Sequence, residues 1–263
     1  MPHGMTWFNY FPGYEQLAAY LRHSHAHATL LGPTAFTVQH VFGAVLVLIV
    51  LLLVGLAANR RLADLEANIV PDGKLSLLTA LEMVVEALYG IMKEIIGPEA
   101  KRYFPLIGTL ALYIFFCNAL GLIPGFEPPT NNVSTNAACA LFVFFYYNYQ
   151  GLRVHGVGHI VHMANPVGTW WGWFLAPLMF PVELIGHLAR PLSLTLRLFG
   201  NMVGDHAVVL GFAAMIPFLV PIPFQALGLL VCVIQAFVFC LLTTTYISMA
   251  TAAAHEEEAH AAH

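Results

Sequence analysis

The chain has 263 residues, of which 59% are hydrophobic and only 9% are charged, and its formal net charge is −4. A soluble domain carries about 25% charged residues, so this composition excludes a water-soluble fold and predicts a protein that crosses a membrane several times. The four cysteines lie in apolar runs without CxxC spacing, which predicts buried thiols rather than a disulfide or a metal site.

The first forty residues precede any clear membrane span and lack the charged start and small-residue cleavage site of a secretory signal. We expect residues 1–40 to form an external segment. His23, His25 and His27 alternate within it. A metal site is one interpretation of this spacing, but three neighbouring histidines without a nearby acid are more typical of a solvated segment.

The first predicted span covers residues 41–58. Together with the uncharged residues before it, this apolar run is long enough to cross ~30 Å of hydrocarbon. Six of the ten basic residues lie between this span and the next: Arg60, Arg61, Lys74, Lys93, Lys101 and Arg102. The positive-inside rule therefore places that segment in the cytoplasm and the N-terminus outside. Apolar residues at helical spacing over residues 75–96 predict an amphipathic helix on the membrane surface.

Two further spans, residues 103–125 and 133–151, are separated by a turn rich in proline and asparagine, which we expect on the external side. The chain returns to the cytoplasm in a polar connection over residues 151–165. Three histidines lie in it: His155, His159 and His162. They would share one helical face, but the glycines among them favour a loop.

Two long apolar segments, residues 170–216 and 224–250, complete a membrane domain that covers residues 41–254. The first contains three prolines and is too long for a simple perpendicular helix, so we expect it to be tilted or kinked. Counting five spans from an external N-terminus puts the polar tail, residues 255–263, in the cytoplasm. The predicted fold is therefore an all-α, polytopic integral membrane protein with about five membrane-embedded helices and one amphipathic surface helix.

Charge in the second half of the chain is concentrated in one stretch. Between residues 154 and 254 only four residues are formally charged: Glu183, Arg190, Arg197 and Asp205. A charge at membrane depth costs at least ~2.5–3.5 kcal/mol on insertion scales, so it requires a partner, a wet cavity or a function. The first three are seven residues apart, which places them on one helix face. Snorkelling from a helix end suits Arg197 poorly, because a further long apolar run follows it.

We expect Arg197 to have a functional role. An arginine stays protonated at physiological pH, because its pKa is above ~12, so it cannot relay protons. It can hold a fixed positive charge that favours the ionised form of an approaching carboxylate and repels cations. Asp205 is rotated from it by ~80° and Glu183 lies ~20 Å away along a helix axis, so we expect the counter-charge to come from another subunit.

Groups that can exchange protons lie on both sides of Arg197 along the chain. Glu183 and His187, four residues apart, can adjoin on one helix face, and a histidine titrates near pH ~6.5. Three more polar groups follow Arg197: Asn201, Asp205 and His206. Gln235 is strongly polar within the last apolar segment, where a helix–helix hydrogen bond explains it as well as an ion path does. This arrangement predicts two separate access paths toward opposite membrane faces.

The sequence RPLSLTLRLFGNMVGDH, followed by QAFVFCLLTTTYISMA in the next apolar segment, resembles subunit a of the rotary ATP synthase. The resemblance extends back through NALGLIP, which begins at Asn118, and PPTNNVSTNAACAL. It covers most of the chain after about residue 75. The LRLFGNM core with the downstream QAF is a specific signal.

This resemblance implies a stationary, non-catalytic subunit of a membrane motor, with no cofactor and no metal. Arg197 matches the family's essential arginine, which faces the proton-binding carboxylates of the rotating c-ring. Glu183 matches the acidic position of the cytoplasmic half-channel. Three residues match polar positions of the other half-channel and of the ring contact: Asn201, His206 and Gln235. We also assign three residues to the proton path: Asn118, His187 and Asp205.

The implied partners are the c-ring, the peripheral-stalk b subunits, the remaining synthase subunits and the lipid bilayer, with no nucleic acid among them. The implied location is the bacterial inner membrane, with an external N-terminus and a cytoplasmic C-terminus. The last two helices would then be long and tilted along the rotor.

Several positions depart from the best-known bacterial pattern of this family. A glutamate is common where His206 stands, a glycine where Asp205 stands, and a histidine where Gly228 stands. One hypothesis is that Asp205 and His206 together replace the missing acid and histidine.

Three other interpretations are weighed against the motor subunit. An independent secondary transporter predicts internal repeats, and no second copy of RLFGNM is found. A structural scaffold leaves the intramembrane Arg197 unexplained. A sodium-driven version of the same motor stays open, because ion choice depends largely on the ring. No nucleotide-binding loop or catalytic-triad spacing is found, so the chain is not expected to be an enzyme by itself.

Overall fold

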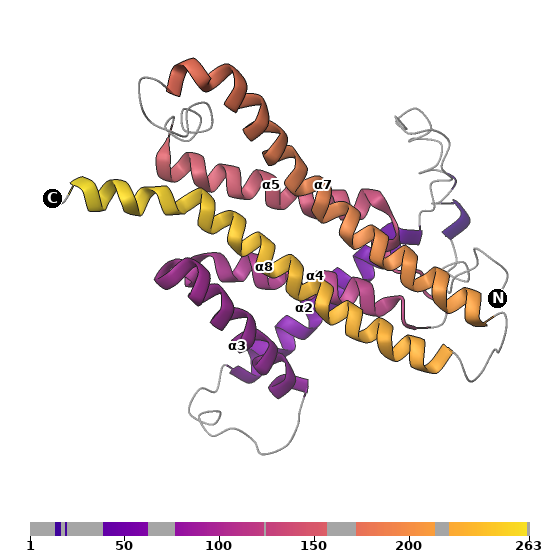
Figure 1. Cartoon of the computed structure of the whole chain (residues 1–263). Helices are drawn as coiled ribbons and strands as arrows, with labels where there is room; N and C mark the ends of the chain where they lie inside the picture. The colour runs from indigo at the N-terminus through magenta and orange to yellow at the C-terminus, as the bar shows by residue number, and fades with distance from the viewer. Residues whose placement is uncertain are drawn as a thin grey trace. The chain divides into compact units, whose positions relative to one another are not determined.

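The computed structural model describes residues 14–16, 19, 39–62, 77–123, 125–156, 172–213 and 221–261. Within these ranges every regular element is a helix (Figure 1), which confirms the predicted all-α class. Several sequence predictions lie outside the described residues: those for His23, His25, His27, His159 and His162, and for most of the external segment 1–40.

Six long helices carry the fold, and two of them are far longer than a typical membrane span. They are α2 (Gln39–Leu62), α3 (Leu77–Ile96), α4 (Ala100–Leu120), α5 (Val133–His155), α7 (Gly172–Ala213) and α8 (Pro221–Ala261). Two short 3-10 turns also occur: η2 (Gly97–Glu99) and η3 (Pro129–Asn131). Helix α7 has 42 residues and α8 has 41, and α8 continues through most of the segment predicted as a polar tail.

Three stretches among the described residues are long and apolar enough to cross a bilayer: Gln39–Asn59, Leu81–Leu120 and Ile222–Thr251. The predicted class, a polytopic helical membrane protein, is therefore confirmed. The total of five spans, their limits and the orientation of the termini stay predictions. The stretch Leu81–Leu120 includes most of the segment predicted as a surface helix, and whether that segment lies on the membrane or in it also stays a prediction.

The chain divides into two compact units, and each is built from segments that are distant in sequence. Unit 1 contains Met1–Leu81, Leu112–Thr135 and Phe199–Gln235. Unit 2 contains Glu82–Ala111, Asn136–Leu198 and Ala236–His263. Helices α7 and α8 therefore each contribute one part to unit 1 and the other part to unit 2.

In unit 1 the turn η3 packs closely against the start of α2. A Cβ atom added to Gly43 of α2 would lie 2.9 Å from Cγ of Pro129, closer than real Cβ contacts essentially ever come. Near the same place, Nδ2 of Asn132 and Nδ1 of His40 lie 3.3 Å apart and join residues 92 positions distant in sequence. This close approach fixes α2 against the turn between α4 and α5.

In unit 2 the core is formed by large side chains of five helices, α3, α4, α5, α7 and α8. Met92 and Tyr103 are fully buried, as is Phe239 on α8. The Ser248 hydroxyl donates a hydrogen bond of 3.2 Å to the carbonyl oxygen of Ile95, at the end of α3. Helix α8 therefore contributes both a buried side chain, Phe239, and a polar contact, that of Ser248, to the packing of this unit.

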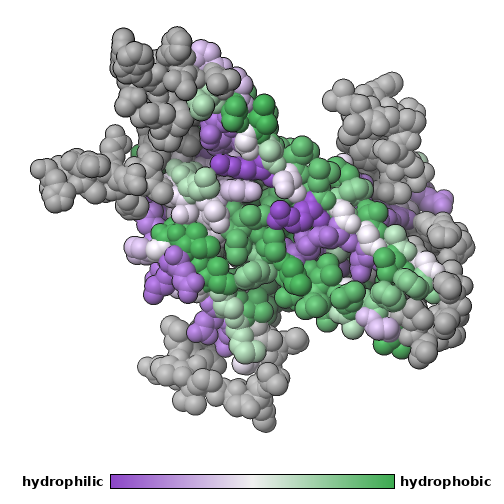
Figure 2. Space-filling model, viewed as in Figure 1, coloured by the Kyte–Doolittle hydropathy of each residue, from purple (hydrophilic) through white to green (hydrophobic). Residues whose placement is uncertain are grey.

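The surface of the helices is apolar, as expected of a protein surrounded by lipid. Exposed large hydrophobic side chains occur on α2, α3, α5, α7 and α8, and two of the most exposed are Leu52 on α2 and Ile185 on α7. Figure 2 shows apolar residues over much of the face in view. In water such a surface would be an aggregation liability, whereas in hydrocarbon it has no such cost.

Replacing Gly43 by alanine should destabilise the protein, because the added methyl group would overlap Pro129. Overpacking of this kind costs ~1–3 kcal/mol. Gly55→Ala on the same helix is the matched control, since a Cβ there meets nothing within 4 Å. Thermal unfolding in detergent should show a lower midpoint for Gly43→Ala only. Equal midpoints for the two variants would contradict the close packing of η3 on α2.

Candidate functional site

The eight residues assigned to the site from the sequence divide between the two compact units. Unit 2 contains Glu183, His187 and Arg197, all on α7. Unit 1 contains Asn118 on α4, Asn201, Asp205 and His206 on α7, and Gln235 on α8. The groups before and after Arg197 on α7 therefore belong to different packing environments.

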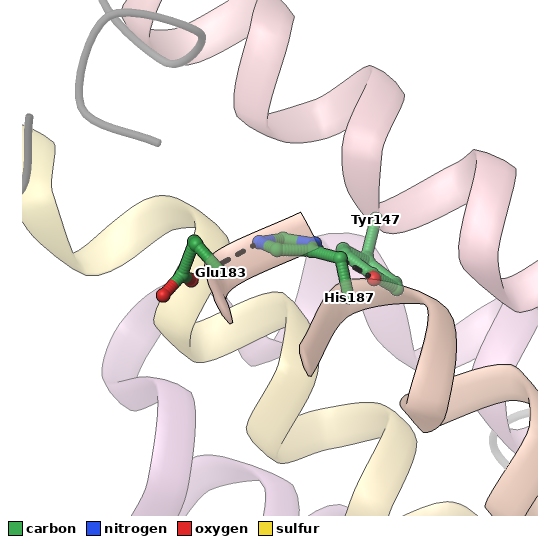
Figure 3. A network of polar contacts seen from close by, with 3 residues as sticks. All are labelled: Tyr147, Glu183 and His187. Carbon is green, nitrogen blue, oxygen red and sulfur yellow. Dashed lines mark hydrogen bonds and ion pairs between the residues drawn. The ribbon is translucent and has the colours of Figure 1, made fainter. Parts of the chain in front are cut away.

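In unit 2, Glu183 and His187 are in contact, and a third residue joins them (Figure 3). The helical spacing of four residues brings His187 Nε2 to 3.4 Å from Oε1 of Glu183. The other ring nitrogen, Nδ1, lies 3.2 Å from the hydroxyl oxygen of Tyr147 on α5. The side chain of His187 is 10% exposed and that of Glu183 is 42% exposed. The three groups thus form a polar chain from a half-exposed carboxylate to a buried phenol.

Arg190 lies beside this chain and contacts aromatic rings. Its guanidinium carbon is 5.3 Å from the ring centroid of Tyr246 and 6.0 Å from that of Tyr147. The two rings are themselves 5.9 Å apart between centroids. The two guanidinium–ring distances are within the range of cation–π attraction, so Arg190 stabilises the orientation of the two tyrosines.

Arg197 is half-buried on α7 between two buried leucines, Leu194 and Leu198. Among the described residues of unit 2, one basic group, His187, lies within 4.0 Å of a carboxylate, that of Glu183, and no described carboxylate of the unit lies that close to the Arg197 guanidinium. No described carboxylate of its own unit therefore neutralises this positive charge. An arginine in this setting can serve as a fixed charge for an acid supplied by another chain.

In unit 1, Asp205 on α7 lies directly over Gly228 on α8. A Cβ atom at position 228 would be 2.8 Å from Oδ2 of Asp205 and 3.0 Å from Cδ2 of Leu122. Only glycine leaves room for the carboxylate in this position. Both residues were noted as departures from the family pattern, and in this chain they are in contact: the acid on α7 lies over the position on α8 that has no side chain.

The other polar residues of unit 1 are less closely connected. Asn118 is buried, and its Oδ1 accepts a 2.6 Å hydrogen bond from the Thr130 hydroxyl, while its Nδ2 has no partner among the described residues. Gln235 is buried, and Asn201 and His206 are half-buried. No hydrogen bond joins these last three to another described side chain of unit 1, so the structure does not bring them together into one network.

Two residues near the site were not found from the sequence: Tyr147 and Tyr246. Tyr147 lies within the run FVFFYYNYQ on α5, where no spacing distinguishes it from its aromatic neighbours. Its partner His187 is 40 positions away, so only the packing of α5 against α7 reveals the contact. The described residues contain no group of three His, Cys, Asp or Glu side chains that could hold a metal ion.

The fold and the site define a polytopic helical membrane protein that carries ionisable groups on its long apolar helices. A family model described as ATP synthase A chain matches residues 40–248. The chain is 48% identical over 216 residues to ATP synthase subunit a 1 of Syntrophotalea carbinolica, an overlap that covers 82% of this chain and 87% of that protein. It is 46% identical over 210 residues to ATP synthase subunit a of Geobacter sulfurreducens, with 80% and 86% covered.

The chain belongs to the ATP synthase A chain family. The resemblance inferred from LRLFGNM, QAF and NALGLIP is thereby confirmed. As a member of this family the chain is a non-catalytic membrane component of the synthase complex.

Replacing Gly228 by alanine should displace the Asp205 carboxylate, because the methyl carbon would lie only 2.8 Å from Oδ2. We expect ATP synthesis in energised membrane vesicles to fall roughly two- to tenfold, which corresponds to ~0.4–1.4 kcal/mol. Gly211→Ala on α7 is the control, since a Cβ there meets nothing within 4 Å. Equal synthesis rates in the two variants, at equal amounts of assembled complex, would show that the position of Asp205 does not matter.

Proposed function

We propose that the chain is the proton-translocating stator subunit of a rotary ATP synthase. It offers two offset half-channels to the carboxylates of a rotating c-ring, and the fixed charge of Arg197 separates them. The observation that carries the proposal is an arginine on the long apolar helix α7 that no described carboxylate of its own unit neutralises, flanked along α7 by polar groups on both sides.

The arginine acts through its charge. A protonated ring carboxylate that approaches Arg197 is converted to its ionised form, because the nearby cation favours the anion. The proton leaves by one half-channel, and the carboxylate takes up another proton from the second half-channel after it has passed. Since Arg197 itself cannot release a proton at physiological pH, protons do not pass directly between the half-channels.

The two half-channels correspond to the two groups of polar residues on either side of Arg197. Glu183 and His187 form the cytoplasmic path, and their contact at 3.4 Å supports a shared role in proton exchange. The external path contains Asn118, Asn201, Asp205, His206 and Gln235. In this path Asp205 supplies the carboxylate, in the space that Gly228 leaves open.

The partners follow from this mechanism. The c-ring supplies the counter-charge for Arg197, and the peripheral-stalk b subunits hold the chain stationary within the remaining synthase. The protein lies in a bacterial inner membrane with five spans, an external N-terminus and a cytoplasmic C-terminal tail, and it requires no cofactor.

Arg197→Ala should abolish ATP-driven proton pumping in inverted membrane vesicles, and Arg197→Lys should reduce it severely because a lysine lacks the fixed planar fork. Loss of a preorganised charge of this kind costs on the order of 100-fold or more in rate. Arg153→Ala, at the exposed end of α5, is the matched control and should pump normally.

The amount of assembled complex must be equal in all three variants. Normal pumping by either Arg197 variant would contradict the proposed role of the fixed charge. Pumping that requires sodium ions in the wild-type vesicles would replace the proton by sodium as the transported ion.

A further inference from the structure

Tyr147 contacts the proposed cytoplasmic path from a helix that the path did not include. Its hydroxyl oxygen lies on α5, 3.2 Å from Nδ1 of His187, while Nε2 of the same ring faces Glu183 on α7 (Figure 3). Each nitrogen of the imidazole therefore has an oxygen partner. A histidine held in this way connects two groups that are themselves too far apart to exchange a proton.

One hydrogen bond, between Tyr147 and His187, and one contact of 3.4 Å, between His187 and Glu183, join the three groups, and their donor and acceptor roles are consistent with one another. An ionised carboxylate can only accept, so the nitrogen that faces Glu183 carries the proton in the neutral ring. The other nitrogen, Nδ1, is then an acceptor, and the Tyr147 hydroxyl donates to it. All donors point from the phenol toward the carboxylate.

Burial increases steadily along the same three groups. The Glu183 side chain is 42% exposed, that of His187 is 10% exposed, and Tyr147 is 1% exposed. The carboxylate is thus the exposed end, and the phenol is the inner end.

The Tyr147 ring is held in place on several sides. Arg190 lies 6.0 Å from its centroid, Tyr246 packs at 5.9 Å, and Phe144 meets it edge-on at 5.5 Å. The hydroxyl therefore stays directed at His187, which a proton relay requires.

We propose that the Tyr147 hydroxyl is the inner member of a three-group relay, Tyr147–His187–Glu183, which carries protons out through the cytoplasmic half-channel. This inference rests on the proposed function. In one transfer the Tyr147 O–H bond breaks as an N–H bond forms at Nδ1. The Nε2–H bond breaks as an O–H bond forms on Glu183, and the incoming proton restores the phenol. Glu183 then releases its proton to water, and the imidazole turns over so that the nitrogen that carries the hydrogen faces Glu183 again. One proton has moved and nothing is oxidised.

The test compares ATP-driven proton pumping by the intact synthase in inverted vesicles, per assembled complex. Tyr147→Phe removes the hydroxyl and keeps the ring against Arg190 and Tyr246. We expect it to lower the initial pumping rate by roughly three- to tenfold. Tyr149→Phe, an exposed tyrosine on the same helix, is the matched control and should pump at the wild-type rate. Equal rates for the two variants would overturn the relay, and so would a failure of Tyr147→Phe alone to assemble.

A second measurement separates a relay from a merely structural hydroxyl. His187→Gln removes the group that connects Tyr147 to Glu183. If the three groups form one path, adding Tyr147→Phe to His187→Gln causes no further loss of pumping. If the hydroxyl only stabilises packing, the two losses multiply, and the relay is overturned.

The same vesicles distinguish failure of the relay from failure of the proposed function. If Arg197→Ala abolishes pumping while Tyr147→Phe pumps normally, the relay alone is wrong. If Arg197→Ala pumps normally, the proposed function fails, and the relay that rests on it fails as well.

Discussion

A positive charge that cannot be removed stands within a long apolar helix, and other polar residues precede and follow it along the same helix. Arg197 stays protonated at any physiological pH, and insertion of such a charge at membrane depth costs at least ~2.5–3.5 kcal/mol. A membrane protein tolerates such a charge when an opposite charge or water compensates it. Within unit 2 the carboxylate Glu183 contacts His187 and not Arg197. The proposed function follows from this uncompensated positive charge, because a carboxylate of a neighbouring subunit is then required to neutralise Arg197.

Proton exchange near such a charge requires groups that are ordered but still reachable by water. In unit 2 the order comes from aromatic packing: Arg190 and two tyrosine rings support the histidine that links a buried phenol to a half-exposed carboxylate. In unit 1 it comes from the absence of a side chain, since Asp205 fits only because position 228 is a glycine. Aromatic packing in unit 2 and a glycine in unit 1 thus position the acids that precede and follow Arg197 along α7.

The sequence predicted what depends on local pattern. Hydropathy gave the helical membrane class, and the four-residue spacing gave the contact of Glu183 with His187, because neighbours on one helix face are determined by helix geometry. Contacts between helices were not predictable in this way. Gly228 was noted as unusual without its link to Asp205, and Tyr147 was indistinguishable from the aromatic residues around it. The division of α7 and α8 between two units also depends on tertiary packing and leaves no sequence signal.

The central claim is that α7 is reached by water from opposite membrane faces on the two sides of Arg197. Gly186 and Gly204 are suited to test it, because an added Cβ meets nothing within 4 Å at either position. Each would be changed to cysteine after the four native cysteines are replaced, and a membrane-impermeant thiol reagent would be added to one face at a time. If two half-channels open to opposite faces, pumping by Gly186→Cys is blocked only from the cytoplasmic face and pumping by Gly204→Cys only from the external face. Block of both variants from the same face would contradict it.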